Sequence, residues 1–303
     1  MEFDMHYETG GQGRTVLLLL HGNFASWRWW RPVLKSMPHG YRAYAPDLRG
    51  CGDSDHPEAG YTIAQHTADL EQLIFALGLP RLHLVGHSLG ACIALQYALK
   101  HPQRIKTLTL VAPAPAQGAA VLQNAHGSRA LMADASAMHS AFRLSENLGN
   151  SRKMLQRALM RMMPSGIGDE DFECLLDDAA RMSHHAAVGH IQTLNSWDVQ
   201  DDLPRLKLPV MIMGGQYDRL IPSAALQHTV QMLPKGRLII WPKVGHAPQL
   251  ERPQRFRKIL LKFIQQESAG PLQRLGKRAG RFLSIRSNGH GRKERKLNSL
   301  EAI

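Results

Sequence analysis

The chain has 303 residues, of which 44% are hydrophobic and 20% charged, a composition typical of a globular protein and not of a fibrous or wholly disordered one. The formal net charge is +12, but it is unevenly spread: residues 1–203 hold 17 basic and 20 acidic side chains, and residues 204–303 hold 20 and 5. We therefore expect any electrostatic partner to meet the C-terminal third.

The first residues and the cysteines bear on where the protein works. Residues 1–4 are acidic where a secretory signal would be basic, and the apolar run Val16–Leu20 is too short to span a bilayer. The three cysteines, Cys51, Cys92 and Cys174, match neither a metal-binding nor a redox spacing. We expect a cytoplasmic protein, with peripheral attachment to a membrane as a further hypothesis.

Short apolar runs rich in β-forming residues alternate with helix-length stretches over most of the chain. The predicted strands are Val16–Leu20, Tyr41–Ala45, Leu82–Val85, Thr107–Val111, Val210–Met213 and Arg237–Trp241. The predicted helices are Ile63–Leu77, Leu89–Leu99 and Ser223–Met232. Continuous apolar strands that alternate with helices are typical of a parallel sheet covered on both faces, so we predict a doubly wound, mostly parallel α/β sheet.

The alternation stops between Ala114 and Pro204, where helical patterns such as Ser151–Met163 and Asp169–His185 occur without a convincing strand. Helices inserted here would lie over the carboxyl edge of the sheet, where such sheets bind ligands. We therefore predict an α/β core from residues 1–113 and 205–264 and a helical lid from residues 114–204.

Residues 265–303 form a separate basic tail, with 9 basic and 3 acidic side chains. Leu272, Leu275, Ala279 and Phe282 fall at helical spacing among arginines and lysines. This pattern fits a short amphipathic helix on an anionic membrane, and it fits a solvated, disordered segment equally well.

The strongest chemical motif is Gly86-His87-Ser88-Leu89-Gly90, which follows a predicted strand and precedes a predicted helix. In this strand–turn–helix context, G-x-S-x-G indicates a nucleophile elbow that holds the serine hydroxyl exposed on a strained turn. Bulky residues at Gly86 and Gly90 would clash in so tight a turn. We therefore predict Ser88 as a catalytic nucleophile.

A serine nucleophile needs a general base and a third group that orients this base. Asp218 lies just after the predicted strand Val210–Met213, and His246 follows the next predicted strand. Both would therefore lie on loops at the sheet edge that carries Ser88. The sequence predicts a triad of Ser88, Asp218 and His246.

The first predicted strand runs into His21-Gly22-Asn23-Phe24. A loop in this place can turn a backbone N–H towards the carbonyl under attack, so we expect the N–H groups of Asn23 and Leu89 to form an oxyanion hole.

On these residues the sequence resembles the α/β-hydrolase superfamily, in its lidded subgroup of esterases, lactonases and C–C bond hydrolases. The matching segments cover roughly residues 14–264 and are His21-Gly22-Asn23, Asp47 to Ser54, Gly86 to Gly90, Gly214 to Pro222, and Gly245-His246 with Glu251-Arg252-Pro253. The resemblance implies the α/β-hydrolase fold, the same triad and the same oxyanion hole. Epoxide hydrolases and haloalkane dehalogenases of this superfamily carry Asp at the nucleophile position, so Ser88 argues against those activities.

The predicted function is serine-dependent hydrolysis of a carboxylic ester, thioester or lactone, with no metal and no organic cofactor. A cofactor-free C–C bond hydrolase, lyase or perhydrolase would use the same triad, and a binding protein that kept the fold is a further alternative. The expected partners are a small apolar acyl substrate and, at the basic C-terminal third, an anionic membrane surface or a carrier protein. Nucleic acid is disfavoured because the tail has almost no aromatic residues.

Other candidate residues fit structural roles better. Asp47 flanks a glycine-rich turn that its side chain can brace, and His87 is expected to point away from the nucleophile. His184, His185 and His190 lack the spacing of a zinc helix, so packing explains them better.

Overall fold

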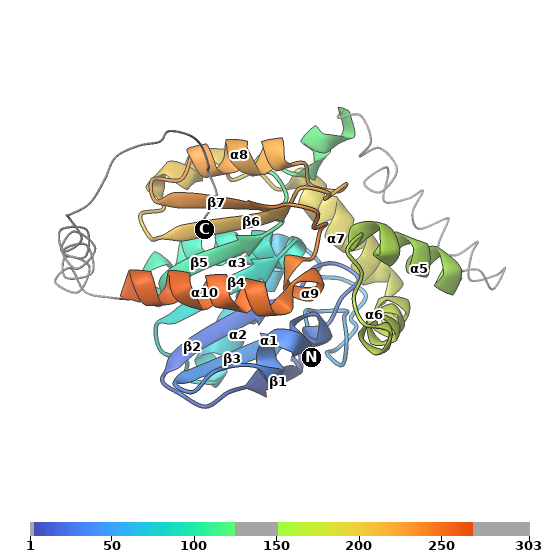
Figure 1. The fold of residues 1–303 in the computed structure, drawn as a ribbon, viewed down its shortest axis with the longest axis horizontal. Helices are drawn as coiled ribbons and strands as arrows, with labels where there is room; N and C mark the ends of the chain where they lie inside the picture. The colour runs from blue at the N-terminus through green and yellow to red at the C-terminus, as the bar shows by residue number, and fades with distance from the viewer. Residues whose placement is uncertain (1–2, 125–150, 269–303) are drawn as a thin grey trace, which may run out of the picture.

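The computed structural model describes residues 3–124 and 151–268, and Figure 1 shows their fold. Within them, seven strands form one sheet in the order β1-β3-β2-β4-β5-β6-β7. The strands are β1 (Tyr7–Gly10), β2 (Thr15–Leu20), β3 (Tyr41–Pro46), β4 (Leu82–His87), β5 (Ile105–Val111), β6 (Val210–Gly215) and β7 (Gly236–Trp241). Only β1 runs antiparallel to its neighbour. The predicted doubly wound, mostly parallel sheet is confirmed.

Helices cover both faces of this sheet (Figure 1). On one face lie α2 (Ile63–Ala76), α3 (Leu89–Lys100) and α8 (Ser223–Gln231), whose apolar side chains join the larger core cluster. On the other face lie α1 (Arg31–Lys35) and α10 (Pro253–Ser268). The remaining short helices are η1 (Trp27–Trp30), η2 (Pro102–Arg104), η3 (Ala119–Asn124), η4 (Gln200–Arg205) and α9 (Pro248–Glu251).

The second strand shows why the sheet is buried on both sides. Successive side chains of a strand point to opposite faces, and every residue of Val16–Leu20 is apolar. Leu18 and Leu20 pack into the core beneath α2 and α3, whereas Leu17 and Leu19 pack against the core of α1 and α10. A continuous apolar run is what a central parallel strand requires.

Within the described residues, three α-helices lie between β5 and β6: α5 (Ser151–Met162), α6 (Asp169–Arg181) and α7 (His184–Ser196). The prediction of one helix over Asp169–His185 is wrong at its end, because the backbone leaves the helical region at Met182 and Ser183 caps the next helix by accepting the N–H of Ala186 at 3.1 Å.

Parts of the predicted lid and tail cannot be compared with the structure. Residues 125–150 of the predicted lid and residues 269–303 of the predicted tail lie outside the described residues. In the described ranges, every helix is too short or too polar to cross a membrane.

Candidate active site

The connection from β4 to α3 has the geometry of a strained elbow. Ser88 has φ 52° and ψ −117°, in the left-handed half of backbone space that side chains other than glycine rarely enter. Its N–H bonds to the carbonyl of Val111 at 2.8 Å. A Cβ on Gly86 would lie 2.2 Å from the carbonyl oxygen of Gly90, and a Cβ on Gly90 would lie 2.3 Å from that of His21. The turn therefore needs both glycines.

Ser88 is also the N-cap residue of α3, and it is half-buried. The first N–H groups of a helix have no partner within the helix, and they carry the positive end of its dipole. Negative charge that develops beside Ser88 would therefore meet a favourable potential. Leu89 is the first residue of the helix, so its N–H is one of these groups.

The acid and the histidine come from the next two strands and meet in the folded chain. Asp218 Oδ2 accepts a hydrogen bond from His246 Nδ1 at 2.8 Å, and both side chains are buried. Asp218 Oδ1 accepts the N–H groups of Leu220 and Ile221 at 2.8 and 3.0 Å. A carboxylate can only accept, so Nδ1 of His246 carries the proton and Nε2 is left as the basic nitrogen.

His87, the residue before Ser88 in the chain, lies against His246. Its ring is 4.9 Å from the ring of His246, and its Nε2 lies 3.0 Å from the carbonyl oxygen of His246. Burial, followed by the nearby His246, lowers the pKa of His87 well below its ordinary value. A neutral His87 donates from Nε2 and places no positive charge beside His246, so its role is structural, as expected.

Ser88 and His246 thus lie on the same side of the sheet, with His87 next to each. Among the described residues the Ser88 hydroxyl makes no hydrogen bond to the His246 ring. Catalytic hydrogen bonds are often long in ligand-free enzymes and shorten when substrate binds. The alignment of Ser88 with His246 therefore remains a prediction.

The loop that carries His246 is tied to the inserted helices. The His246 N–H bonds to the carbonyl of Met162, at the end of α5, at 2.7 Å. A Cβ on Gly245 would lie 2.2 Å from the same carbonyl oxygen. Glu251 Oε1 accepts the N–H of Gly245 at 2.8 Å, and Glu251 Oε2 accepts that of Ser165 at 3.0 Å. Burial raises the pKa of Glu251, against the effect of these hydrogen bonds.

The loop after β2 lies against the nucleophile, since a Cβ on Gly22 would be 3.0 Å from the Ser88 Cβ. His21 fixes this loop: its Nε2 accepts the N–H of Leu48 at 2.8 Å, and its Nδ1 therefore donates to the carbonyl of Gly22 at 2.7 Å. Burial lowers the pKa of His21, which keeps this ring neutral.

The Asn23 side chain is held by the inserted helix α7. Its Oδ1 accepts from His190 Nδ1 at 2.9 Å and from the N–H of Phe24 at 3.1 Å. Within residues 3–124 and 151–268, no acceptor takes the N–H of Asn23. Anchoring of the side chain leaves this N–H available, as the predicted oxyanion hole requires.

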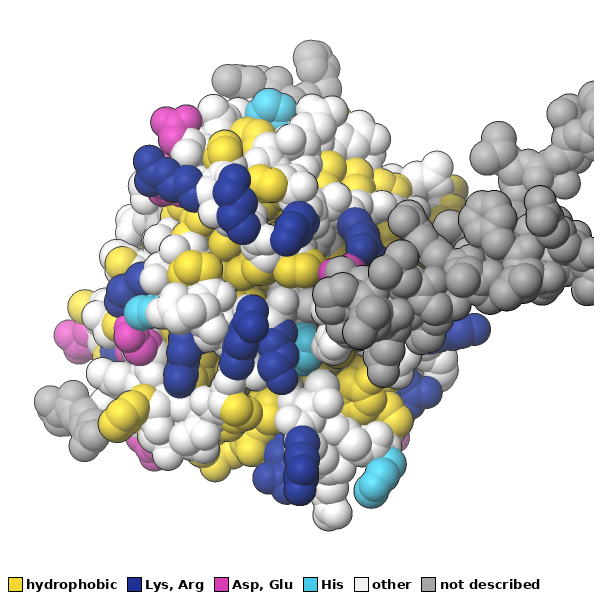
Figure 2. Space-filling view, turned by 90° about the vertical axis from the view of Figure 1, so that its left-hand side faces the viewer, with side chains coloured by type: hydrophobic (Ala, Val, Ile, Leu, Met, Phe, Trp, Pro, Cys, Tyr) yellow, Lys and Arg dark blue, Asp and Glu magenta, His cyan; other side chains and the backbone are white. Residues whose placement is uncertain are grey.

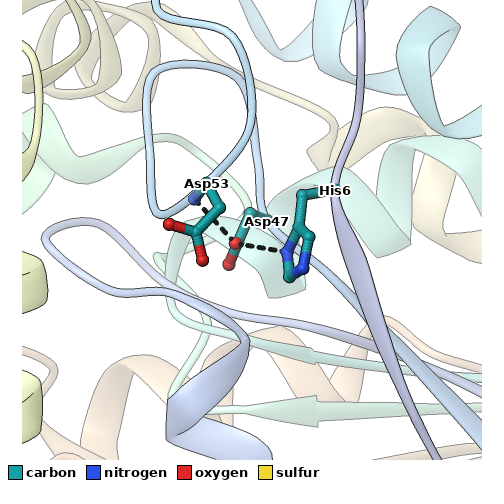
Figure 3. A group of neighbouring side chains, drawn as sticks. All are labelled: His6, Asp47 and Asp53. Carbon is teal, nitrogen blue, oxygen red and sulfur yellow. Dashed lines mark hydrogen bonds and ion pairs between the residues drawn. The ribbon is translucent and has the colours of Figure 1, made fainter.

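Asp47 has the bracing role that was expected. Its Oδ1 accepts the N–H of Trp27, and its Oδ2 accepts from His6 Nδ1 at 2.9 Å and from the Asp53 N–H at 3.0 Å (Figure 3). His6, Asp47 and Asp53 are close enough to hold a metal ion. Three of the roughly four lone-pair sites of Asp47 are already used by these donors, so the cluster fits a structural turn better than a cation site.

The three histidines of the predicted lid do not converge. His184 and His185 pack edge to face with their ring centres 5.8 Å apart, whereas His190 is buried beside His66 and Tyr61, at 4.9 and 5.4 Å. Burial and nearby histidines lower the pKa of His190 well below its ordinary value. His190 supports the site in a way that the sequence did not indicate, because it lies in no motif with Asn23. Glu251 stands in the same matching segment as Gly245, but the sequence assigned it no role.

The chain matches known proteins over most of its length. The family model described as "alpha/beta hydrolase fold" matches residues 15–253. A "Putative carbamate hydrolase RutD" of Stutzerimonas stutzeri is 26% identical over 271 residues, 87% of this chain and 97% of the relative. The 2-hydroxy-6-oxononadienedioate/2-hydroxy-6-oxononatrienedioate hydrolase of Paraburkholderia phymatum is 28% identical over 284 residues, 88% and 92% of the two chains. An esterase of Exiguobacterium antarcticum has a similar fold, with TM-score 0.76 and 22% identity over 87% of this chain and 96% of its own.

Proposed function

Because the chain belongs to the α/β hydrolase fold family, we propose that it is a serine-dependent hydrolase that cleaves a carboxylic ester, thioester or lactone through an acyl-enzyme on Ser88. The observation that carries this proposal is the strained backbone of Ser88, at φ 52°, beside the buried Asp218–His246 hydrogen bond of 2.8 Å. Strain of this kind costs roughly 1–3 kcal/mol and persists where function requires the geometry.

The reaction follows from the proton positions. His246 Nε2 takes the proton of the Ser88 hydroxyl as the oxygen attacks the carbonyl carbon. Asp218 holds the proton on Nδ1, and its charge stabilises the imidazolium that forms. His246 then protonates the leaving group and activates a water molecule that hydrolyses the acyl-enzyme.

Two backbone N–H groups stabilise the tetrahedral intermediate. The N–H groups of Asn23 and Leu89 donate to the oxyanion, and α3 adds the positive end of its dipole. Removal of one such donor costs roughly 3 kcal/mol of transition-state stabilisation. The neutral state of His87 and His21 also supports the mechanism, because a permanent charge beside His246 would disfavour its protonation.

The inserted helices form a lid that selects a small apolar acyl substrate. The hydrogen bond from His246 to Met162, and that from His190 to Asn23, join α5 and α7 to two parts of the catalytic machinery. Movement of the lid would therefore change the positions of both His246 and the loop that carries Asn23.

The test is hydrolysis of p-nitrophenyl esters of graded acyl length by the wild type and by Ser88→Ala. Wild-type turnover that is lost in Ser88→Ala supports the proposal, and the preferred chain length measures the acyl pocket. Equal turnover by both proteins contradicts it.

A second candidate is a hydrolase of C–C bonds that uses the same residues. The relative in Paraburkholderia phymatum, named a 2-hydroxy-6-oxononadienedioate hydrolase, favours this candidate. A dienedioate of that type, followed by its own absorbance, separates the two. Cleavage of the dienedioate without any ester turnover favours the C–C hydrolase, and binding without cleavage of either substrate favours a binding protein.

A further inference from the structure

The amino edge of the sheet, opposite the candidate active site, carries a concentration of cations. Each of the six parallel strands begins within three residues of a lysine or arginine, and α3 ends on another. We call this set the basic edge: Arg14, Arg42, Arg81, Lys100, Arg104, Lys106, Arg205, Lys207, Lys235 and Arg237. Figure 2 shows lysines and arginines spread across this face with few carboxylates between them.

Most of these cations are free to meet a partner. All except Lys106 are exposed. Three of the ten have a carboxylate partner within the described residues: Lys100 pairs with Glu71, Arg205 with Asp202, and Arg237 with Glu267. In the same part of the chain, Arg14, Arg42 and Lys235 form no ion pair. The basic edge draws on both halves of the sequence, although the excess of basic over acidic residues lies in the C-terminal third.

Helix dipoles account for only part of this charge. The helices α2, α3, α8 and α10 end at this edge, and each C-terminus is equivalent to roughly half a negative charge. Their sum of about two negative charges, with the three paired carboxylates, leaves an excess of about five positive charges on the face.

An exposed aromatic residue stands on the same edge. Phe75, the second-last residue of α2, is 85% exposed. The Gly78 N–H bonds to the Phe75 carbonyl at 2.9 Å, and Arg104 reaches the carbonyl of Leu79 at 3.4 Å. The C-terminal end of α2, which carries Phe75, is therefore close to the strand starts of β4 and β5 that carry these cations. A large apolar side chain among cations is typical of surfaces that rest on anionic lipid.

We propose that the basic edge docks the protein on an anionic phospholipid membrane, with the ring of Phe75 inserted among the lipid headgroups. The cations supply attraction to phosphate-bearing lipids, and Phe75 supplies a contact that a purely electrostatic partner would not use. The carboxyl edge then faces away from the bilayer, so docking fixes where the enzyme works and does not feed substrate from the membrane.

The end of α10 gives this surface a continuation. Glu267 pairs with Arg237, and Gln265 donates to the Tyr41 hydroxyl at 3.1 Å, so the helix ends on the basic edge. The 35 residues that follow Ser268 in the sequence carry nine lysines and arginines. Their charge has the sign that would add to the same attraction.

Phe75 is the aromatic side chain that the described part of this edge exposes most, and this favours lipid over nucleic acid, because proteins that bind single strands present several aromatic side chains for base stacking. An acidic protein partner would use the cations but would not require Phe75 to enter an apolar phase.

The test is co-sedimentation of the full chain with vesicles of phosphatidylglycerol and phosphatidylcholine, and with pure phosphatidylcholine. The proposal expects binding to the anionic vesicles alone, with loss at high salt. Arg42→Glu/Lys235→Glu should lower the partition coefficient roughly tenfold or more. The control Lys153→Glu/Arg157→Glu, on α5, makes the same change of net charge at the opposite edge and should have little effect. Thermal unfolding checks that all variants are folded.

The contribution of Phe75 is tested by a separate variant with a matched control. Phe75→Ser should weaken vesicle binding several-fold, whereas Met160→Ser, which removes a 58% exposed apolar side chain on α5, should not. Equal loss in both charge-reversed proteins, or no loss in either, overturns the proposal, because binding would then follow net charge or the tail alone. Tighter binding to duplex DNA than to the anionic vesicles, unaffected by Phe75→Ser, also overturns it.

Discussion

The two edges of the sheet are built from opposite kinds of side chain. At the carboxyl edge, His21, His87 and His190 are buried with lowered pKa values, next to the strained Ser88. At the amino edge, the arginines and lysines of the basic edge are exposed, and most have no carboxylate partner among the described residues.

Because of this difference, we expect the two edges to respond to different solution conditions, one to pH and the other to salt. Buried neutral histidines resist protonation, so the carboxyl edge should respond to acid. Exposed cations remain charged but are screened by ions, so the amino edge should respond to salt. Helix direction contributes to both, because α3 begins at Ser88 and the C-termini of α2, α3, α8 and α10 lie at the other edge.

The largest expected effect lies at the carboxyl edge. Asp218→Asn should lower kcat for ester hydrolysis roughly 10⁴-fold, because the amide no longer holds the proton on Nδ1 of His246. The exposed Asp201 provides a control, and Asp201→Asn should leave kcat unchanged. Steady-state kinetics measure both, and similar kcat values for the two variants would remove Asp218 from the mechanism.

The next effect tests the junction between the inserted helices and the His246 loop. Gly245→Ala places a Cβ 2.2 Å from the Met162 carbonyl oxygen, and a backbone atom cannot move away easily. We expect a loss of about 2 kcal/mol in the free energy of unfolding, with reduced turnover. Gly168→Ala is the control, because its Cβ would meet no atom within 4 Å and its φ is −61°. Urea denaturation compares them, and equal stability of the two variants would contradict the close packing.

The third expected effect is a decrease in the free energy of unfolding at acidic pH. Burial lowers the pKa of His66 to about 4, and within the described residues neither of its ring nitrogens has a hydrogen-bond partner. The unfolded chain binds this proton near pH 6.5 and the folded chain does not, so stability should fall as pH decreases from 6.5 to 4.

His66→Leu removes this titration. Between pH 6.5 and 4 the free energy of unfolding should fall less steeply in the variant, by up to about 1.4 kcal/mol per pH unit. Urea denaturation across this range measures the slopes. Parallel curves for the wild type and His66→Leu would show that His66 is not buried in the neutral form.

The smallest effect belongs to the amino edge. Mutual repulsion within the basic edge is screened by salt, so wild-type stability should rise by about 0.5 kcal/mol between low and high sodium chloride. Arg42→Glu/Lys235→Glu should show less of this rise, as measured by thermal unfolding at several salt concentrations. An equal rise in both proteins would indicate that the basic edge carries no repulsive excess.

Much of the sheet could be predicted because its strands consist of continuous apolar runs in the sequence. The six parallel strands were each found to within two residues at their ends, since a buried parallel strand has no polar face to interrupt the pattern. The edge strand β1 (Tyr7–Gly10) was missed. Its residues are mostly exposed, and they pair antiparallel with Tyr44 and its neighbours without an apolar signal.

The residues of the candidate site also fall into those that the sequence predicted and those that it did not. Ser88, Asp218 and His246 follow strands, and a strand end fixes the position of the residue that follows it. His190 could not be found so, because its contact with Asn23 depends on how α7 packs against the loop after β2. Glu251 was part of the matching segment with Gly245, but the hydrogen bond between them depends on how the His246 loop folds. Packing between inserted helices and loops has no sequence period to reveal it.

The most direct test of the central claim is the site of covalent labelling by a fluorophosphonate, which reacts with activated serines. Intact-mass and peptide mass spectrometry should find one adduct, on the peptide that carries Ser88, and His246→Ala should react far more slowly because the base that activates the hydroxyl is gone. Labelling at another residue, or equal labelling of the wild type and His246→Ala, would contradict a nucleophilic Ser88 at the carboxyl edge.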